Sequence, residues 1–184
     1  MKKLTYALVL SAALGAASMS MAADTVMVGG QSMYPAKDII DNAVNSADHT
    51  TLVAAVKAAG LVETLKGKGP FTVFAPTNAA FAKLPLGTVD TLVKPENKAT
   101  LTKILTYHVV SGKYDFNALA SAIKKNHGTA ELPTVSGGKL MFMMNGMHNI
   151  QVKDETGNVA TISTYDVYQS NGVINVVDSV LMPM

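Results

Sequence analysis

The stretch from Gly69 to Leu84, GPFTVFAPTNAAFAKL, constrains the fold of this chain more than any other part. Phe71–Phe74 is a run of aromatic and β-branched residues between a Gly-Pro pair and Pro76, which predicts a short buried strand. Pro76 cannot donate a ladder hydrogen bond, so the strand is expected to end there. Thr77 or Asn78 can then cap a helix. The stretch therefore predicts a rigid junction between a sheet and a helical layer, without a nucleophile, a metal-ligand set or a phosphate loop.

Helical periodicity flanks this junction, and short extended runs follow it. Apolar residues at helical spacing predict helices over 38–47 and 48–59, and Pro95 is expected to open a further helix that reaches residue 105. Residues 114–125 are expected to be partly helical. The strands are expected at residues 107–110, 140–144, 150–153, 159–165 and 173–181. Helices that come first and antiparallel strands that come later predict an α+β fold rather than alternating βαβ units.

Three blocks of the chain resemble the fasciclin-like domain family. Thr72–Phe81, TVFAPTNAAF, is similar to the family's first block, Tyr107-His108 to its central pair, and Asn171–Pro183 to its closing block. The resemblance implies a wedge-like α+β domain, a β-sandwich with a helical layer, over residues 38–184. It also implies a secreted or surface-attached adhesion module. In that family the Tyr-His pair is linked with adhesion; the alternative is that the rings of Tyr107 and His108 pack inside and tie helix to strand.

The N-terminus has the pattern of a secretory signal peptide over residues 1–22. Lys2 and Lys3 precede an apolar run, and Ser20 and Ala22 suit a cleavage after Ala22. Residues 23–37 are polar and contain glycine, and we expect them to form an extended N-terminal arm. We expect an exported protein, periplasmic or extracellular, with no membrane span, no lipid anchor and no disulfide, because the sequence has no cysteine and no second long apolar stretch.

Charge and motifs exclude several classes of function. Removing Lys2 and Lys3 takes the formal charge from +2 to zero, arginine is absent, and the lysines are scattered, so we expect no nucleic-acid binding. No hydrolase, zinc-protease, Walker or dinucleotide motif occurs, and we expect no enzyme. The primary expectation is a non-enzymatic binding or adhesion module for a protein or polysaccharide of the envelope or matrix.

Residues 140–150, LMFMMNGMHNI, form the most unusual segment. Asn145-Gly146 predicts a hairpin. A two-residue turn would set Met144 opposite Met147, whereas a three-residue loop, Asn145–Met147, would set it opposite His148. The second register is preferred because it gathers the large apolar residues, Leu140, Phe142, Ile150 and Val152, on one face. Met141 and Met143 would then point away from it.

This hairpin suggests an alternative function, a periplasmic Cu(I)-binding protein. Thioether sulfur is a soft ligand, and the candidate ligands are Met141, Met143, Met144, Met147 and His148. Strand alternation allows only two or three of the sulfurs to share one ion. Further ligands would come from Met27, Met33, Met182 or Met184, or from a second chain. The competing interpretation is that these methionines only fill gaps in the core.

Overall fold

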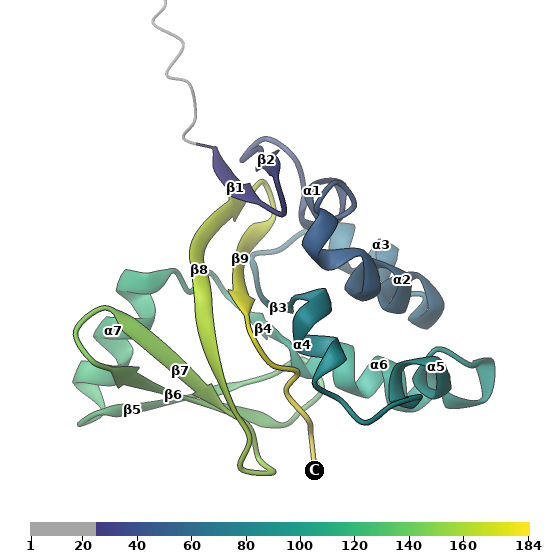
Figure 1. Cartoon of the computed structure of the whole chain (residues 1–184). Helices are drawn as coiled ribbons and strands as arrows, with labels where there is room; N and C mark the ends of the chain where they lie inside the picture. Colours follow the sequence, from purple (N-terminus) through teal and green to yellow (C-terminus); the bar gives the residue numbers. More distant parts are fainter. Residues whose placement is uncertain (1–24) are drawn as a thin grey trace, which may run out of the picture.

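Seven strands form one sheet in the order β4-β3-β9-β8-β7-β6-β5 in the computed structural model, which describes residues 25–184 (Figure 1). Strands β3 and β9 are parallel, and all other neighbours in this sheet are antiparallel. The strands are β3 Phe71–Pro76, β4 Val109–Ser111, β5 Thr129–Pro133, β6 Lys139–Asn145, β7 Asn149–Lys153, β8 Val159–Gln169 and β9 Gly172–Val177. The expected signal peptide, residues 1–22, lies outside the described residues.

The long strand β8 bends this sheet into a sandwich. Its pairing with β9 shifts register between Ile162 and Val167, and such irregularities bend a strand. The two ends of the sheet consequently face each other, and the rings of Phe74 on β3 and Phe142 on β6 lie 5.1 Å apart between them. An isolated bridge from Val110 to Thr134 joins the two ends. The α+β architecture expected from the sequence, a β-sandwich with a helical layer, is confirmed.

Helices cover the other face of β3 and β9, and α7 packs on β5 and β6 (Figure 1). The helices are α1 Ile39–Ala43, α2 Thr50–Ala59, α3 Val62–Lys66, α4 Asn78–Ala82, α5 Thr88–Leu92, α6 Lys98–Tyr107 and α7 Phe116–Lys125, with 3-10 turns at Ala47–His49 and Pro95–Asn97. Thr77 caps α4 as expected, because its side chain accepts a hydrogen bond from the Ala80 N–H at 3.2 Å.

Several boundaries differ from the sequence-based expectations. Residues 38–47 hold only the short α1, with Asp38 as its N-cap, before a 3-10 turn. Pro95 opens a 3-10 turn that precedes α6. Tyr107 ends α6 instead of starting a strand, because the His108 N–H still donates to the Leu105 carbonyl at 3.2 Å and keeps the chain helical. The last strand ends at Val177.

The region expected to be an extended arm, residues 23–37, contains a β-hairpin. Strands β1 Val26–Val28 and β2 Gln31–Met33 pair antiparallel around a Gly-Gly turn with φ values of 58° and 74°. Val28 and Met33 are 9% and 3% exposed and join the helical core. The expectation was wrong because two glycines that tolerate positive φ form a hairpin turn, and the apolar residues beside them then have a surface to pack on.

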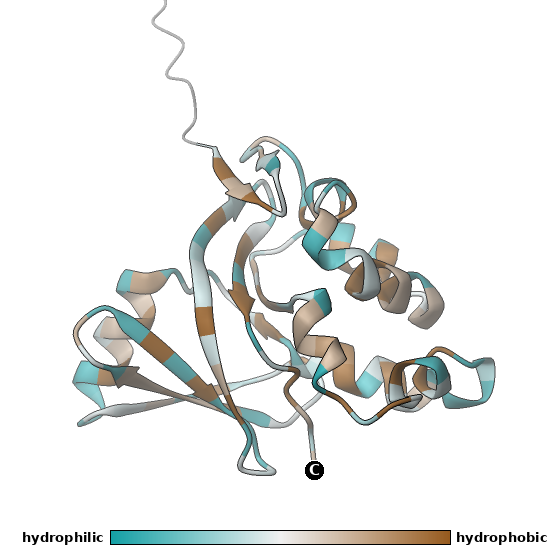
Figure 2. Ribbon diagram, viewed as in Figure 1, coloured by the Kyte–Doolittle hydropathy of each residue, from teal (hydrophilic) through white to brown (hydrophobic). Residues whose placement is uncertain are grey.

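Strand β3 separates two hydrophobic cores. Val73 and Ala75 face the helical core, whereas Phe74 faces the sandwich core. A strand that is buried on both faces has a continuous apolar sequence, whereas β7 is buried on one face and alternates hydrophobic and hydrophilic residues (Figure 2). The apolar run at Phe71–Phe74 follows from this central position.

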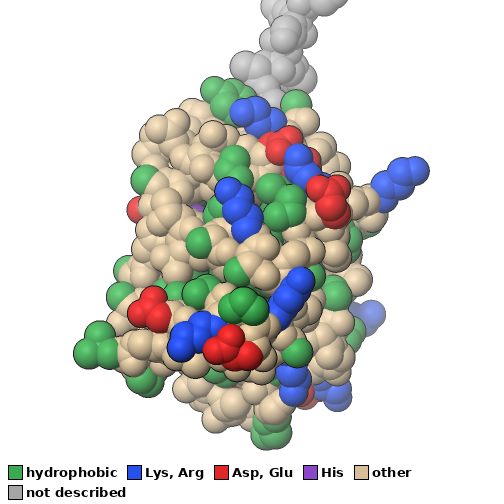
Figure 3. Space-filling view, turned by 90° about the vertical axis from the view of Figure 1, so that its right-hand side faces the viewer, with side chains coloured by type: hydrophobic (Ala, Val, Ile, Leu, Met, Phe, Trp, Pro, Cys, Tyr) green, Lys and Arg blue, Asp and Glu red, His purple; other side chains and the backbone are tan. Residues whose placement is uncertain are grey.

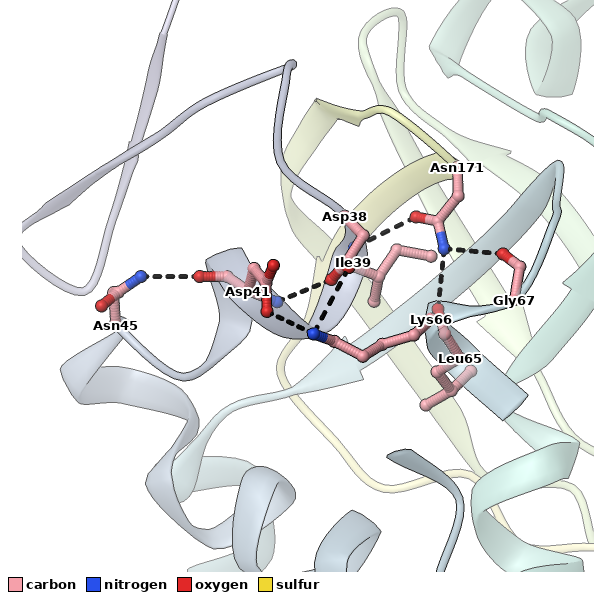
Figure 4. Close-up of polar contacts among 8 residues, drawn as sticks. All are labelled: Asp38, Ile39, Asp41, Asn45, Leu65, Lys66, Gly67 and Asn171. Carbon is pink, nitrogen blue, oxygen red and sulfur yellow. Dashed lines mark hydrogen bonds and ion pairs between the residues drawn. The ribbon is translucent and has the colours of Figure 1, made fainter. Parts of the chain in front are cut away.

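The side chain of Asn171 joins three segments that are far apart in the sequence (Figure 4). Its Oδ1 accepts a hydrogen bond from the Ile39 N–H at 3.1 Å, and its Nδ2 donates to the Leu65 carbonyl at 2.7 Å and the Gly67 carbonyl at 3.1 Å. The first residue of α1, the end of α3 and the β8–β9 turn are thereby fixed to one another.

The backbones of the same region approach closely where β3 meets β9. A Cβ atom at Gly69 would lie 1.9 Å from the Asn171 carbonyl oxygen, and one at Gly172 would lie 2.1 Å from the Phe71 carbonyl oxygen. No side chain fits at either position, so both glycines are required by the parallel pairing of β3 and β9.

His108 and Asp154 fix the segment that follows β9. His108 Nδ1 contacts the Ile104 carbonyl at 2.9 Å, and its Nε2 accepts from the Leu181 N–H at 3.0 Å. The next amide, of Met182, donates to the buried carboxylate of Asp154 at 2.8 Å. Because Nε2 of His108 accepts a hydrogen bond, it carries no proton. The ring is therefore neutral, with its proton on Nδ1. Burial lowers the pKa of His108 to about 4, and the Ile104 carbonyl and Asp154 offset only part of the effect.

Replacing Asn171 with alanine should lower the free energy of unfolding by about 2–3 kcal/mol, because the Leu65 and Gly67 carbonyls and the Ile39 N–H lose their partner in a half-buried place. Urea unfolding of the variant measures this. Asn45→Ala is the matched control, since it loses one exposed hydrogen bond to the Asp41 carbonyl and should cost less than about 0.5 kcal/mol. Equal losses in both variants would contradict the role given to Asn171.

Stability should fall as the pH drops from about 6.5 to about 4. In that window His108 becomes protonated in the unfolded chain but stays neutral in the folded chain. The difference between its two pKa values lowers the free energy of unfolding by up to about 3 kcal/mol. Buried His49, whose pKa is also lowered, adds to the slope. Urea titrations at several pH values should show a shallower slope for His108→Gln and an unchanged one for the exposed His148→Gln. An unchanged slope in His108→Gln would be inconsistent with the buried neutral ring.

Candidate functional site

The β6–β7 hairpin has a three-residue loop, Gly146–His148, because Asn145 pairs with Asn149 and Met144 with Ile150. Both registers expected from the sequence are wrong. A two-residue turn centred on Asn145-Gly146 needs positive φ at both residues, but only Gly146 has it, at 76°. Asn145 therefore stays in the strand, and the loop begins one residue later than in the preferred register.

The distribution of side chains over the two faces is as predicted, because the observed pairing keeps the alternation of the preferred register. Leu140, Phe142, Ile150 and Val152 are all fully buried in the sandwich core. Met141 and Met143 lie on the opposite, open face of the sheet, where they are half-buried. The sequence pattern determined the faces, but it did not determine the loop.

The five proposed copper ligands are divided between three environments. Met144 packs against the sandwich core, on the face opposite to Met141 and Met143. Met147, which is 84% exposed, and His148 project from the loop into solvent. Met143 on the open face and the loop pair Met147-His148 are thus the candidates that lie near the hairpin end and outside the core.

The other methionines are placed elsewhere. Met33 is buried in the helical core, and Met27 on β1 is exposed, with its sulfur 3.1 Å from the Ser32 hydroxyl. Met182 packs against the helical core, and Met184 is exposed at the C-terminus, where its carbonyl accepts a hydrogen bond from Lys103. Among residues 25–184, no group of three or more His, Asp or Glu side chains is placed to hold a metal ion.

Tyr107 and His108 are inside the molecule, with exposed fractions of 0% and 2%. The Tyr107 hydroxyl donates to the Lys139 carbonyl at 2.7 Å and accepts from the Glu155 N–H at 3.0 Å. Burial raises the pKa of this hydroxyl to about 12. Both rings are therefore inside the molecule, and each holds neighbouring segments of the chain in place.

A polar hollow that sequence reasoning missed lies between the α3–β3 loop and the β8–β9 turn. Its volume is about 500 Å³, and its lining includes Lys66, Lys68, Lys113, Asn171 and the backbone of the glycine-rich loop. The only sequence signal was the alternation of lysine and glycine before Pro70. That signal gave no hint of Lys113 or Asn171, because folding alone brings these segments together.

The three lysines of the hollow differ in their pairing. Lys66 contacts the Asp41 carboxylate at 2.7 Å and that of Asp38 at 3.7 Å (Figure 4). Within residues 25–184, Lys68 and Lys113 form no ion pair, and Lys113 Nζ lies 4.4 Å from the centre of the Tyr168 ring. Two cations of the hollow are therefore available to an anionic partner.

The surface on the helical side is mixed in charge. On the helical side, lysine and acidic side chains are interspersed with hydrophobic ones, without a continuous basic stripe (Figure 3). None of the helices in the described part of the chain is long and apolar enough to cross a membrane.

Comparisons with known proteins agree with this architecture. Residues 47–183 match the model of the family described as "Fasciclin domain". Protein sll1483 of Synechocystis is 44% identical over 169 residues, which cover 91% of this chain and 85% of the relative. Immunogenic protein MPB70 of Mycobacterium bovis is 37% identical over 146 residues, which cover 77% of this chain and 66% of the relative.

A further relative and a solved structure extend the likeness to surface proteins. Cell surface glycolipoprotein MPB83 of Mycobacterium bovis is 41% identical over 126 residues, covering 67% of this chain and 48% of the relative. A FAS1 domain pair from the insect cell adhesion molecule fasciclin I superposes with a TM-score of 0.71 at 18% identity. The match covers 80% of this chain and 51% of that pair, so this chain spans about half its length. No enzyme family is indicated, and the chain belongs to the fasciclin domain family.

Proposed function

We propose that this protein is an exported, non-enzymatic adhesion module that binds carboxylate-bearing partners, protein or polysaccharide, through the lysine-lined hollow. Export is supported by the leader pattern of residues 1–22 and by the surface location that the name of MPB83 gives for that relative. Adhesion is supported by the family and by the fasciclin I domain pair, which comes from a cell adhesion molecule.

The observation that carries the proposal is that Lys68 and Lys113 of the hollow form no ion pair within residues 25–184, although the charge of Lys113 also acts on Asp166. Lys68 on the α3–β3 loop and Lys113 after β4 both line it. Lys66 is held by two carboxylates and contributes little net charge. Backbone groups of the glycine-rich loop and the Asn171 region provide polar surface between the two cations. A chain of carboxylates, as in an acidic polysaccharide, or an acidic protein loop fits such a surface.

The double variant Lys68→Ala/Lys113→Ala should bind polygalacturonate at least about tenfold more weakly than the unaltered protein, because two charge-assisted contacts are lost. Surface-immobilised polymer and a salt series measure the affinity. The matched control is Lys124→Ala/Lys125→Ala, which removes the same charge from the last turn of α7, outside the hollow.

The methyl-esterified, neutral polymer should bind poorly to every variant. An acidic protein immobilised in the same way shows, by comparison with the polymer, whether the partner is a protein or a polysaccharide. Equal loss of affinity in both double variants would show that net charge, and not the hollow, controls binding. No binding of any acidic polymer or protein would refute the proposed function.

A second function, Cu(I) binding at the hairpin end, is favoured by one observation. Met147 and His148 are exposed in a loop although a methionine usually prefers the core, and Met143 lies on the open face near them. Two thioethers and an imidazole form a ligand set suited to Cu(I) rather than to zinc, magnesium or calcium. Met144 is left out of the proposed set because its side chain packs against the sandwich core.

Titration with a Cu(I) chelator of known affinity tests this second function. The unaltered protein should compete for Cu(I), and Met147→Leu and His148→Ala should each weaken binding by about tenfold or more, since each removes one of three ligands. Met144→Leu, which alters a methionine on the core side, should bind like the unaltered protein. Failure of the unaltered protein to compete, or equal binding by all variants, would exclude the copper site.

A further inference from the structure

Two asparagines in this chain are followed directly by glycine. An asparagine in that position loses its side-chain amide most easily, because glycine has no side chain to shield its backbone nitrogen from the neighbouring amide. Asn145-Gly146 lies at the end of β6, and Asn171-Gly172 lies at the start of β9. The two pairs have the same local sequence but very different surroundings.

The pair Asn145-Gly146 is exposed, as are residues 147–149 of the same loop. In the hairpin, residues 139–153, hydrogen bonds that involve a side chain are formed by Lys139 and the Ile150 N–H alone, so the Asn145 amide is not held. Gly146 lies outside both strands, and among residues 25–184 its N–H takes part in none of the backbone hydrogen bonds of turns and loops. The two groups that would react are therefore unpaired and open to water.

The pair Asn171-Gly172 is held by the fold. The Asn171 amide forms three hydrogen bonds, with the Ile39 N–H and the carbonyls of Leu65 and Gly67 (Figure 4). Gly172 is buried and pairs with β3 on one side and with β8 on the other. A reaction between these two residues would break all three side-chain bonds and disturb the centre of the sheet.

We propose that Asn145-Gly146 is a site of spontaneous deamidation in the folded protein, and that the tertiary structure protects Asn171-Gly172 from the same reaction. Asn145 is the last residue of β6, so only its pairing with Asn149 has to open before the main chain at this point can rotate. The end of a hairpin opens locally at much lower cost than the centre of a sheet.

The reaction needs only water and a base from the solvent. The backbone nitrogen of Gly146 gives its proton to the base and attacks Cγ of Asn145. The bond between Cγ and Nδ2 breaks, and Nδ2 leaves as ammonia with a proton taken from water. The cyclic imide then takes up one water molecule. Opening at Cγ gives aspartate, and opening at the main-chain carbonyl carbon gives isoaspartate.

Both products change the loop that carries Met147 and His148. Each places a negative charge where a neutral amide stood, and isoaspartate also adds a carbon atom to the main chain, so the pairing of Asn145 with Asn149 cannot keep its geometry. Asn145 is exposed and contributes nothing to the sandwich core, so the modified protein should remain folded. The proposal does not depend on copper binding at this loop.

Peptide mass spectrometry of the folded protein, kept at mildly alkaline pH, tests the proposal. We expect a carboxylate to appear at Asn145 at least about tenfold faster than at Asn171, because three hydrogen bonds of Asn171 must break before it can react. The rate at Asn145 should rise with pH, since base removes the proton of Gly146. Labelling by an isoaspartate methyltransferase should mark the peptide that contains Asn145. In guanidinium chloride, which unfolds the chain, both pairs should react at similar rates.

The control variant is Asn145→Gln, which keeps the amide but would have to close a larger and less favourable ring. It should remove the reaction of the hairpin peptide and leave the slow reaction at Asn171 unchanged. The proposal is overturned if Asn145 stays intact in the folded protein, or if Asn171 reacts as fast as Asn145 there. It is also overturned if the difference persists in the unfolded chain, because the local sequence and not the fold would then be its cause. The unaltered protein alone, folded and unfolded, decides between these outcomes.

Discussion

The parallel pairing of β3 with β9 is the constraint on which the rest of the structure depends. It joins two segments about a hundred residues apart and places them in the middle of the seven-stranded sheet. The close backbone approach excludes any side chain at Gly69 and Gly172, and the amide of Asn171 then connects the same place to α1 and α3. The two hydrophobic cores lie on the two faces of these strands, so both cores contain residues of this strand pair.

The buried polar side chains form hydrogen bonds that connect distant segments of the chain. Because they are buried, they cannot contact a partner at the surface. Tyr107, His108 and Asp154 each have hydrogen-bond partners on distant strands or on the C-terminal segment. Because an unpaired buried polar atom costs free energy, a fully paired one is good evidence of a structural role. His49 is the exception among residues 25–184, because its buried Nε2 forms no hydrogen bond of normal geometry.

The two proposed contact surfaces differ in their physical basis. The contact proposed at the hollow depends on two lysines that form no ion pair within residues 25–184, so it is expected to be electrostatic and salt-dependent. The Cu(I) site proposed at the hairpin end depends instead on soft thioether and imidazole ligands, so recognition there depends on the type of metal ion.

The sequence by itself determined what depends on neighbours in the chain. The strand, proline corner and capped helix at Phe71–Ala82 and the buried face of β6 were predictable, because propensity, capping and alternation are local. The loop of the β6–β7 hairpin was not predictable, because Asn145 lies in the strand and its φ angle depends on how the whole strands pair. The lysine-lined hollow and the Asn171 junction exist only in the tertiary structure. Their members are far apart in sequence, and only the non-local pairing of β3 with β9 brings them together.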